Sequence, residues 1–310
     1  FKTDLHVDTV ITGAQIVALT GQQESRNSFD IKSDGVNPKV SLRYLFSDAL
    51  QVYALASRGF QFGGIQINPP VAGVAATAPE IFKPYKSSTL WNYELGLRSV
   101  WFGSRLQADL TAFYQDWTDL QITQRKPFIP EGERVSLTLN VTENIGSAVS
   151  RGVEAALAAK LAPGLDLNSS AAWIDARTTE DFDSSAGFVP AGSPLPGSPR
   201  WQWSNRLDYR PQWAWLGHWG LAASLRHAHV GRSYNNLQKF REQGDYDIVD
   251  LHLRVHSTQA AGWQPELSLA LRNLADVRGI SAVTGNSGGR DVFYYFVAPR
   301  TLSLSVGFQL

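Results

Sequence analysis

The chain of 310 residues contains no cysteine and no methionine, and its 28 basic residues balance 28 acidic ones. Without cysteine there is no disulfide framework, no thiol chemistry and no cysteine-ligated metal site. A formal net charge of zero disfavours nucleic acid as the main partner, because phosphate binding requires a basic excess. No run of about 18 apolar residues occurs, which excludes a transmembrane helix.

Alternation with a period of two dominates what is present. In DIVDLHLRVH, residues 247–256, aliphatic residues alternate with ionisable ones. The aliphatic set is Val249, Leu251, Leu253 and Val255, and the ionisable set is Asp250, His252, Arg254 and His256. The same pattern recurs in PKVSLRYLF, LWNYELGLRSVW and RTLSLSVGFQL, and about a dozen such segments predict β-strands with two chemically different faces. Even VEAALAAKLA (153–162), which has helical composition, is predicted as a strand because strand-like segments flank it.

Short and long connections between these segments alternate along much of the chain. Short ones lie at 46–49, 102–104 and 161–164. Long ones, rich in glycine, serine and proline, lie at about 62–86, 124–134, 180–199, 233–244 and 276–292. This alternation predicts an up-and-down meander with tight turns at one end and large loops at the other.

Alternation alone does not say which face is covered. A soluble sandwich buries its apolar face against a second sheet, whereas an outer-membrane barrel turns that face to lipid. Charged polar faces, strands of about ten residues and aromatic residues near strand ends favour the barrel. The aromatic residues are Trp91, Trp101, Trp117, Trp201, Tyr234, Phe293, Tyr294 and Tyr295. We therefore predict an all-β fold, a transmembrane antiparallel up-and-down β-barrel, with Val249, Leu251, Leu253 and Val255 facing lipid.

Seven segments in order resemble the TonB-dependent receptors of Gram-negative outer membranes, and among these the siderophore receptors most. They are YALASRGFQFGGI (53–65), NYELGLRS (92–99), DLTAFYQDWTDLQIT (109–123), NIGSAVSRGVEAAL (144–157), PLPGSPRWQWSNRLDY (194–209), LRNLADVRG (271–279) and APRTLSLSVGFQL (298–310). Each segment is weakly specific alone, and their order carries the resemblance over residues 40–310.

The resemblance implies a barrel of about 22 strands closed around a plug, of which residues 1–310 form the C-terminal portion with about a dozen strands. The resemblance also implies that the plug domain is absent from this chain and lies before Phe1. FKTDLHVDT has neither a start methionine nor a signal peptide's pattern, so we expect the chain to be a fragment or processed product that lacks an N-terminal portion. The implied location is the outer membrane of a Gram-negative bacterium.

The implied function is energy-dependent uptake of a scarce ligand, above all a ferric siderophore, driven through TonB. The implied partners are that ligand, the outer-membrane lipid and the TonB–ExbB–ExbD complex, the last reached through the missing N-terminal part. The resemblance implies no enzyme and no cofactor.

Cations beside aromatic residues in the long connections are the candidates for ligand binding. They form three groups: Arg125, Lys126 and Phe128; Arg232, Tyr234 and Arg241; and Arg290, Tyr294 and Tyr295. Cations with aromatic rings suit an anionic, partly aromatic iron chelate. Interfacial arginine and tyrosine also anchor barrels in the membrane, so each residue has that second explanation.

Catalytic and metal-binding motifs are absent from the sequence. His252 and His256 share a face but lie about 13 Å apart in a strand, too far to share a metal ion, and are expected to line the lumen. His227 and His229 are expected to contact headgroups or a loop. Glu180, Asp181 and Asp183 lack the ligand spacing of a calcium loop.

Three other functions compete with the receptor. A passive porin or adhesin barrel would have no plug and would conduct as an open channel. An outer-membrane hydrolase would need a serine or aspartate clustered with a histidine, and the spacing offers none. A soluble all-β binding module would need no detergent.

Overall fold

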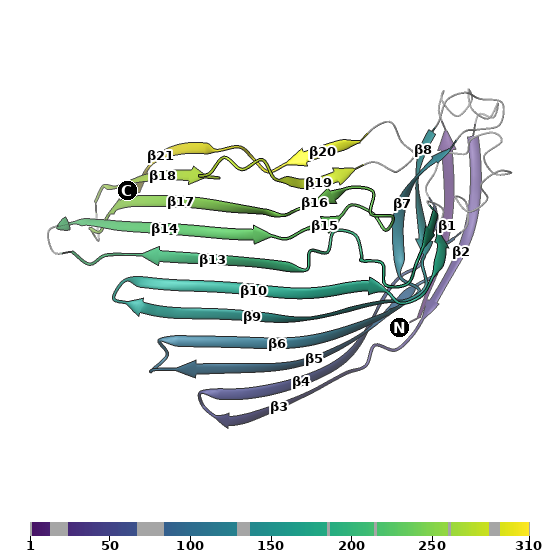
Figure 1. Cartoon of the computed structure of the whole chain (residues 1–310), viewed down its shortest axis with the longest axis horizontal. Helices are drawn as coiled ribbons and strands as arrows, with labels where there is room; N and C mark the ends of the chain where they lie inside the picture. The colour runs from purple at the N-terminus through teal and green to yellow at the C-terminus, as the bar shows by residue number, and fades with distance from the viewer. Residues whose placement is uncertain are drawn as a thin grey trace.

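One antiparallel sheet of 11 strands forms most of the molecule, in the order β21-β18-β17-β14-β13-β10-β9-β6-β5-β4-β3 (Figure 1). The computed structural model describes residues 2–12, 24–66, 84–128, 137–184, 187–213, 216–259, 262–284 and 292–309. The strands of the sheet are β3 (Lys39–Ser47), β4 (Leu50–Gln61), β5 (Ser88–Trp101), β6 (Leu106–Thr118), β9 (Ala148–Ala162), β10 (Leu165–Thr178), β13 (Trp201–Tyr209), β14 (Trp219–Val230), β17 (Tyr246–Ser257), β18 (Gln264–Arg272) and β21 (Thr301–Gln309).

Neighbours in the sheet are also neighbours along the chain, so the predicted meander is confirmed. Residues 153–162 belong to β9, as predicted despite their helical composition. Tight turns join the strands at one end, as between β9 and β10. There Gly164 has a φ of +75°, and a Cβ would lie 2.1 Å from the carbonyl oxygen of Arg210. Glycine is needed because it alone combines this conformation with so close an approach.

Separate antiparallel hairpins occupy the opposite, right-hand end of the strands in Figure 1. They are β1 (Lys2–Thr12) with β2 (Glu24–Asp34), β7 (Gln121–Phe128) with β8 (Leu137–Asn144), β11 (Phe182–Ser184) with β12 (Gly187–Val189), β15 (Ser233–Tyr234) with β16 (Glu242–Gln243), and β19 (Ile280–Thr284) with β20 (Phe293–Phe296).

The prediction that residues 124–134 form a loop was therefore wrong at its start, because β7 continues to Phe128 and pairs there with Leu137. The sequence QITQRK of β7 lacks a clear alternation. Outside the membrane both faces of a hairpin can meet water, so no two-residue period is required.

Direct cross-strand pairing shows which residues share a face, since paired side chains lie on the same side of a sheet. Leu251 and Leu253 of β17 pair with Leu225 and Ala223 of β14. Leu302, Leu304 and Val306 of β21 pair with Leu271, Leu269 and Leu267 of β18. One face is therefore aliphatic across the sheet, and its other face carries pairs such as Arg226 with Asp250 and Arg254 with Glu266.

The aliphatic face is exposed rather than buried. Leu95, Leu302 and Leu304 are 59, 65 and 66% accessible. A soluble sandwich would cover such a face with a second sheet, and no second layer packs on it within the described part of the chain. This exposure decides between the two alternatives that the sequence left open, in favour of a lipid-facing surface. No helix among the described residues is long and apolar enough to cross a membrane.

Buried hydrophobic residues lie instead at the end of the sheet that carries the hairpins, which we call the outer end. Ile145, Val189 and Leu237 are each at most 2% accessible and form one cluster, with four partly buried residues packed on it. These four are Leu120, Ile122, Phe182 and Leu195. The cluster joins the hairpins β7–β8, β11–β12 and β15–β16, so the outer end is a packed layer.

The predicted aromatic ring at the strand ends is confirmed for three of its eight residues. Tyr234, Phe293, Tyr294 and Tyr295 lie instead in the separate hairpins β15–β16 and β19–β20. Trp91, Trp101 and Trp201 lie on the aliphatic face and are 36, 51 and 52% accessible. Trp117 pairs with Leu90 and Ala148, which places it on the polar face. Proximity to a strand end does not fix the side, and the alternation of β6 does: Trp117 lies an odd number of positions after Leu110, which is on the aliphatic face.

Candidate functional site

Two of the outer hairpins, β15–β16 and β19–β20, form a joint surface that contains most of the predicted ligand contacts. The backbone of Gly244 donates to the carbonyl of Ile280 at 2.8 Å. The backbone of Val283 donates to the side-chain oxygen of Gln243 at 3.0 Å. The hairpins lie side by side at the outer end (Figure 1), and we call them together the outer platform.

Arg241 is the best-placed cation of the outer platform. Its Nε donates to the hydroxyl of Tyr294 at 3.1 Å, and its guanidinium lies 4.1 Å from the ring centroid of Phe240. Its backbone N–H donates to the side chain of Asn235 at 2.9 Å, which holds the loop. No carboxylate of the described residues pairs with Arg241, so its charge is available to an anion.

Arg232 differs, because its charge is already used. It lies 3.0 Å from Asp245 and 3.4 Å from Glu242. The hydrogen bond to Asp245, followed by the charge of Glu242, raises the pKa of Arg232 above its usual value. Two carboxylates around one exposed guanidinium leave no net positive charge, so Arg232 is a poorer anion ligand than the sequence suggested.

The tyrosines of the platform divide between structure and surface. Tyr234 is half-buried, and its carbonyl accepts a hydrogen bond from Gly197 at 2.9 Å. Tyr294 and Tyr295 are 42 and 53% accessible, and as neighbours in a strand they point to opposite faces of β20. The structure therefore brings Tyr294 to Arg241 and directs Tyr295 away from that pair.

Four predicted residues are not placed at the platform. Arg125, Lys126 and Phe128 belong to β7, and the structure describes their backbone but not their side chains. Arg290 lies outside the described residues.

Sequence reasoning missed the residue that supports Arg241. Phe240 precedes it directly, and this Phe-Arg pair was an available sign of cation–π contact. It also missed two contacts that hold the loop before Arg241 in place. The side-chain amide of Gln238 donates to the Ser184 hydroxyl of β11 at 3.1 Å, and Leu237 packs in the outer hydrophobic cluster. The contact of Gln238 with Ser184 joins positions 54 apart and has no sequence signature.

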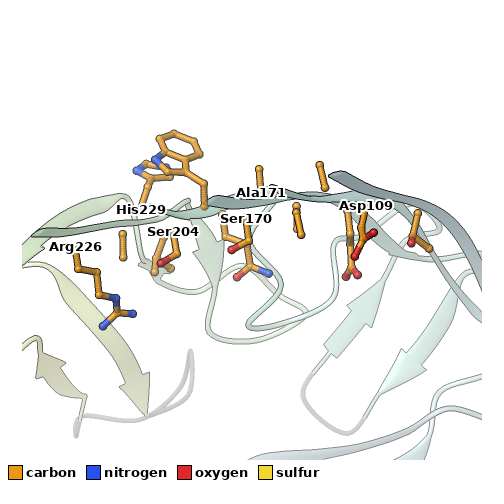
Figure 2. Close-up of a pocket in the computed structure, with 15 residues that line it drawn as sticks. Asp109, Ser170, Ala171, Ser204, Arg226 and His229 are labelled. Carbon is orange, nitrogen blue, oxygen red and sulfur yellow. The ribbon is translucent and has the colours of Figure 1, made fainter. Parts of the chain in front are cut away.

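The polar face of the sheet forms a hollow of about 470 Å³. In Figure 2, Arg226, Ser204, Ser170 and Asp109 project from one side of the sheet, whereas His229 projects from the other. The floor of the hollow consists mainly of small side chains from β9, β10, β13 and β14. The polar face is thus recessed and lined by polar groups, as expected of a lumen wall.

The histidines whose side chains the structure describes do not form a metal centre. The Asp247 carboxylate lies 2.8 Å from His227 and 3.2 Å from His229, and His229 stacks on Trp203 with ring centroids 3.9 Å apart. In the described ranges no three residues of His, Cys, Asp or Glu are arranged to hold a metal ion. Asp181, from the acidic loop, accepts a hydrogen bond from the backbone of Ala191.

These features define an outer-membrane β-barrel: an antiparallel meander, an apolar lipid-facing surface with aromatic borders, a polar inner wall, and packed hairpins at one end of the strands. Residues 5–274 match the family model described as "TonB dependent receptor-like, beta-barrel". The chain belongs to the TonB-dependent receptor family. It is accordingly an outer-membrane protein of the Gram-negative type, and its family consists of transport receptors rather than enzymes.

Several solved receptor structures are similar in fold to this chain. The ferric yersiniabactin uptake receptor FyuA from Yersinia pestis is 20% identical, with a TM-score of 0.69 over 92% of this chain and 39% of its own. The ferric preacinetobactin receptor BauA from Acinetobacter baumannii is 17% identical, with a TM-score of 0.60 over 92% and 37%. The pyoverdine receptor FpvA from Pseudomonas aeruginosa is 18% identical, with a TM-score of 0.57 over 91% and 37%. The chain thus spans about two fifths of each receptor's length.

Proposed function

We propose that this chain is the C-terminal part of a receptor barrel that takes up a ferric siderophore across the outer membrane, with energy delivered through TonB. The observation that carries the proposal is Arg241. It is an accessible cation without a carboxylate partner among the described residues, and Phe240 and Tyr294 hold it at the outer end of the barrel.

The chemistry of the platform suits a ferric chelate. Siderophores offer anionic oxygens and often aromatic rings, which a guanidinium and exposed tyrosine rings can recognise together. Tyr294 fixes the orientation of Arg241 before the ligand arrives, which lowers the entropy lost on binding. Membership of the family and the fold shared with siderophore receptors support the same reading.

The proposal requires a plug domain inside the barrel, and the chemistry of the polar inner wall is compatible with one. Residues 1–310 would be barrel throughout, and the plug and the segment that contacts the TonB–ExbB–ExbD complex would precede Phe1. A wall of alternating charge with a recess of small side chains, as around Ser170 and Ser204, offers polar contacts and space to a folded plug. A passive porin or adhesin would use the same wall without one.

Uptake by cells tests the proposal. A strain lacking the gene would receive the complete receptor that carries this chain, and radioactive iron uptake would be measured from a panel of ferric siderophores. We expect uptake of at least one chelate, abolished by a protonophore and by loss of TonB. Uptake that survives both treatments, together with open-channel conductance in planar bilayers, would contradict the proposal and establish the passive barrel.

The platform has its own control within the same experiment. Arg241→Gln should reduce binding of the transported chelate, whereas Arg232→Gln, which removes an equal charge already matched by Asp245 and Glu242, should leave it nearly unchanged. Equal losses in both variants would show that general surface charge, rather than the site at Arg241, attracts the ligand.

A further inference from the structure

Three arginines converge on one carboxylate at the outer end of the sheet. Asp175 of β10 lies 2.5 Å from Arg177, 3.1 Å from Arg200 and 3.4 Å from Arg151. The Asp175 side chain is 7% accessible, while the side chains of Arg177, Arg200 and Arg151 are 41, 59 and 62% accessible. One buried carboxylate thus holds three exposed guanidinium groups, with a net charge of +2.

Strand register places Asp175, Arg151 and Arg177 on the lipid-facing side, and the side chain of Arg200, directly before β13, reaches Asp175 there. Asp175 pairs directly with Arg151. Two positions closer to the tight-turn end of β10, on the same face, Trp173 pairs with Val153 on one side and with Trp201 on the other. This row continues the aliphatic surface, because further inward Leu167 of the same face pairs with Leu207. The cluster therefore does not point into the lumen.

The height of the cluster matches the border of the membrane. Asp175 lies ten positions after Leu165, which follows the tight turn, and this is about 33 Å along a strand. At the strand tilt of about 40° usual in such barrels this is about 25 Å of height, the thickness of their apolar band. The arginines thus lie just beyond the ring of Trp173 and Trp201, where lipid headgroups begin.

The neighbouring groups leave the cluster positive. Arg151 pairs across the strands with Tyr114, which is 44% accessible, and the next residue outward on that face is Asp116, opposite Val149. Counting Asp116 as well as Asp175, the patch still carries one net positive charge. Arg200 is held in place because its carbonyl accepts a hydrogen bond from the backbone of Ile174 at 2.9 Å.

We propose that Arg151, Arg177 and Arg200 bind a phosphate group on the headgroup of an outer-leaflet lipid. Like charges held this close repel one another unless an anion joins them, and one carboxylate neutralises only one of the three. A guanidinium binds phosphate through parallel hydrogen bonds, while Trp173, Trp201 and Tyr114 contact the adjoining acyl and headgroup region. Asp175 then orients the three donors. The proposal does not depend on which ligand is transported.

The test uses the complete receptor in detergent, mixed with diphosphorylated lipid A, with its dephosphorylated form, or with inorganic phosphate. Retained lipid is measured by native mass spectrometry. We expect the phosphorylated lipid to be retained at least about tenfold better than the dephosphorylated one, and inorganic phosphate to displace it only weakly because it lacks acyl chains. Equal retention of the two lipids by the unaltered protein would overturn the proposal, as would displacement by inorganic phosphate at the lipid's own concentration.

Variants locate the effect. Arg151→Gln leaves Asp175 with two partners, so the barrel should fold, and we expect retention to fall roughly three- to tenfold. The triple variant R151Q/R177Q/R200Q should abolish the preference for phosphate. A matched triple variant R206Q/R226Q/R254Q removes the same charge from the lumen face of β13, β14 and β17 and should retain the lipid. Unchanged retention in Arg151→Gln, or equal loss in the matched triple variant, would show that the cluster is a structural brace only.

Discussion

The guanidinium of Arg241 donates a hydrogen bond to the hydroxyl of Tyr294 across 3.1 Å, although the two residues lie 53 positions apart in the chain. The contact joins the hairpins β15–β16 and β19–β20 and turns two separate clusters of polar and aromatic residues into one surface. It also directs a cation outward from an aromatic support, Phe240.

Substitution of Arg241 should weaken ligand binding if the proposed function is correct. A hydrogen bond between a charged donor and its acceptor contributes roughly 1.5–3 kcal/mol, so Arg241→Gln should raise the Kd of the ferric chelate about 10- to 100-fold. Tyr294→Phe, which only releases the guanidinium, should have a smaller effect. Equilibrium binding to the purified receptor measures both, and Arg232→Gln is the matched control, with an expected change below about threefold.

Asn273 should be among the residues most sensitive to substitution outside the ligand site. It is 3% accessible. Its side chain donates to the carbonyls of Val277 and Ala298 and accepts from the backbone of Val277, at 2.8–2.9 Å, with a φ of +49°. Asn273→Ala leaves these groups unpaired and places alanine in the left-handed region, a loss of about 2–4 kcal/mol.

The measurement for Asn273 is the temperature at which the folded receptor loses its altered mobility in detergent gels. Asn236→Ala serves as control, because the side-chain oxygen of Asn236 accepts one hydrogen bond, from the backbone of Phe240 in the outer loop. The Asn236→Ala variant should lose about 1 kcal/mol of stability. Equal shifts for the two variants would contradict the role of Asn273 as a junction between β18 and the segment before β21.

The sequence predicted the sheet well because the membrane imposes its pattern directly. Val249, Leu251 and Leu253 must meet lipid and Asp250 must meet the lumen, so each strand records its two environments residue by residue. The same rule fails beyond the membrane border, where both faces of a hairpin meet water and β7 shows no clear alternation.

The candidate site was predicted only in part for the same reason. Exposed cations and tyrosines in long connections could be named from the sequence, but not which of them already had partners. Arg232 and Arg241 look alike in the sequence, and the fold gives Arg232 two carboxylates and Arg241 none among the described residues. The face of Trp117, by contrast, could have been predicted, since it lies an odd number of positions after Leu110 and Ala112 in an alternating segment.

A ring lying on glycine should make Gly96 intolerant of any side chain. Gly96 of β5 pairs directly with Tyr53 of β4, and a Cβ there would lie 2.1 Å from the tyrosine ring. The hydroxyl of Tyr53 bonds Thr111 at 3.1 Å and Arg98 lies over its ring, so the ring is not free to move. Gly96→Ala should destabilise the receptor by about 1–3 kcal/mol.

Gly59→Ala is the matched control for Gly96, because a Cβ at that position in β4 meets nothing within 4 Å. Its stability should stay unchanged or rise by up to about 1 kcal/mol. The double variant Tyr53→Ala/Gly96→Ala should lose less stability than the sum of its two single variants, since the second substitution then meets no ring. Additive losses in the detergent-gel melting assay would rule out the ring contact as the cause.

Truncation of Leu237 should loosen the outer layer and the ligand site together. Leu237 is 2% accessible and packs with Ile145 and Val189, which come from two other outer hairpins. Leu237→Ala should cost about 2–5 kcal/mol of local stability, because the cluster is small and cannot collapse around the cavity. None of the residues that form this cluster or pack on it belongs to the 11-stranded sheet, so the barrel should still assemble while the outer hairpins open.

Limited proteolysis of intact cells separates these two outcomes. In the Leu237→Ala variant the segment 231–245 should become cleavable at protease concentrations that leave the unaltered receptor whole, and the Kd of the ferric chelate should rise because Arg241 lies in the same segment. Leu274→Ala is the control, since Leu274 is 39% accessible and lies in the turn after β18, away from the cluster. If Leu237→Ala is cleaved no more readily than Leu274→Ala, the outer hairpins are stable without the cluster. The platform then owes its shape to the contacts between its own two hairpins, which join Gly244 to Ile280, Gln243 to Val283 and Arg241 to Tyr294.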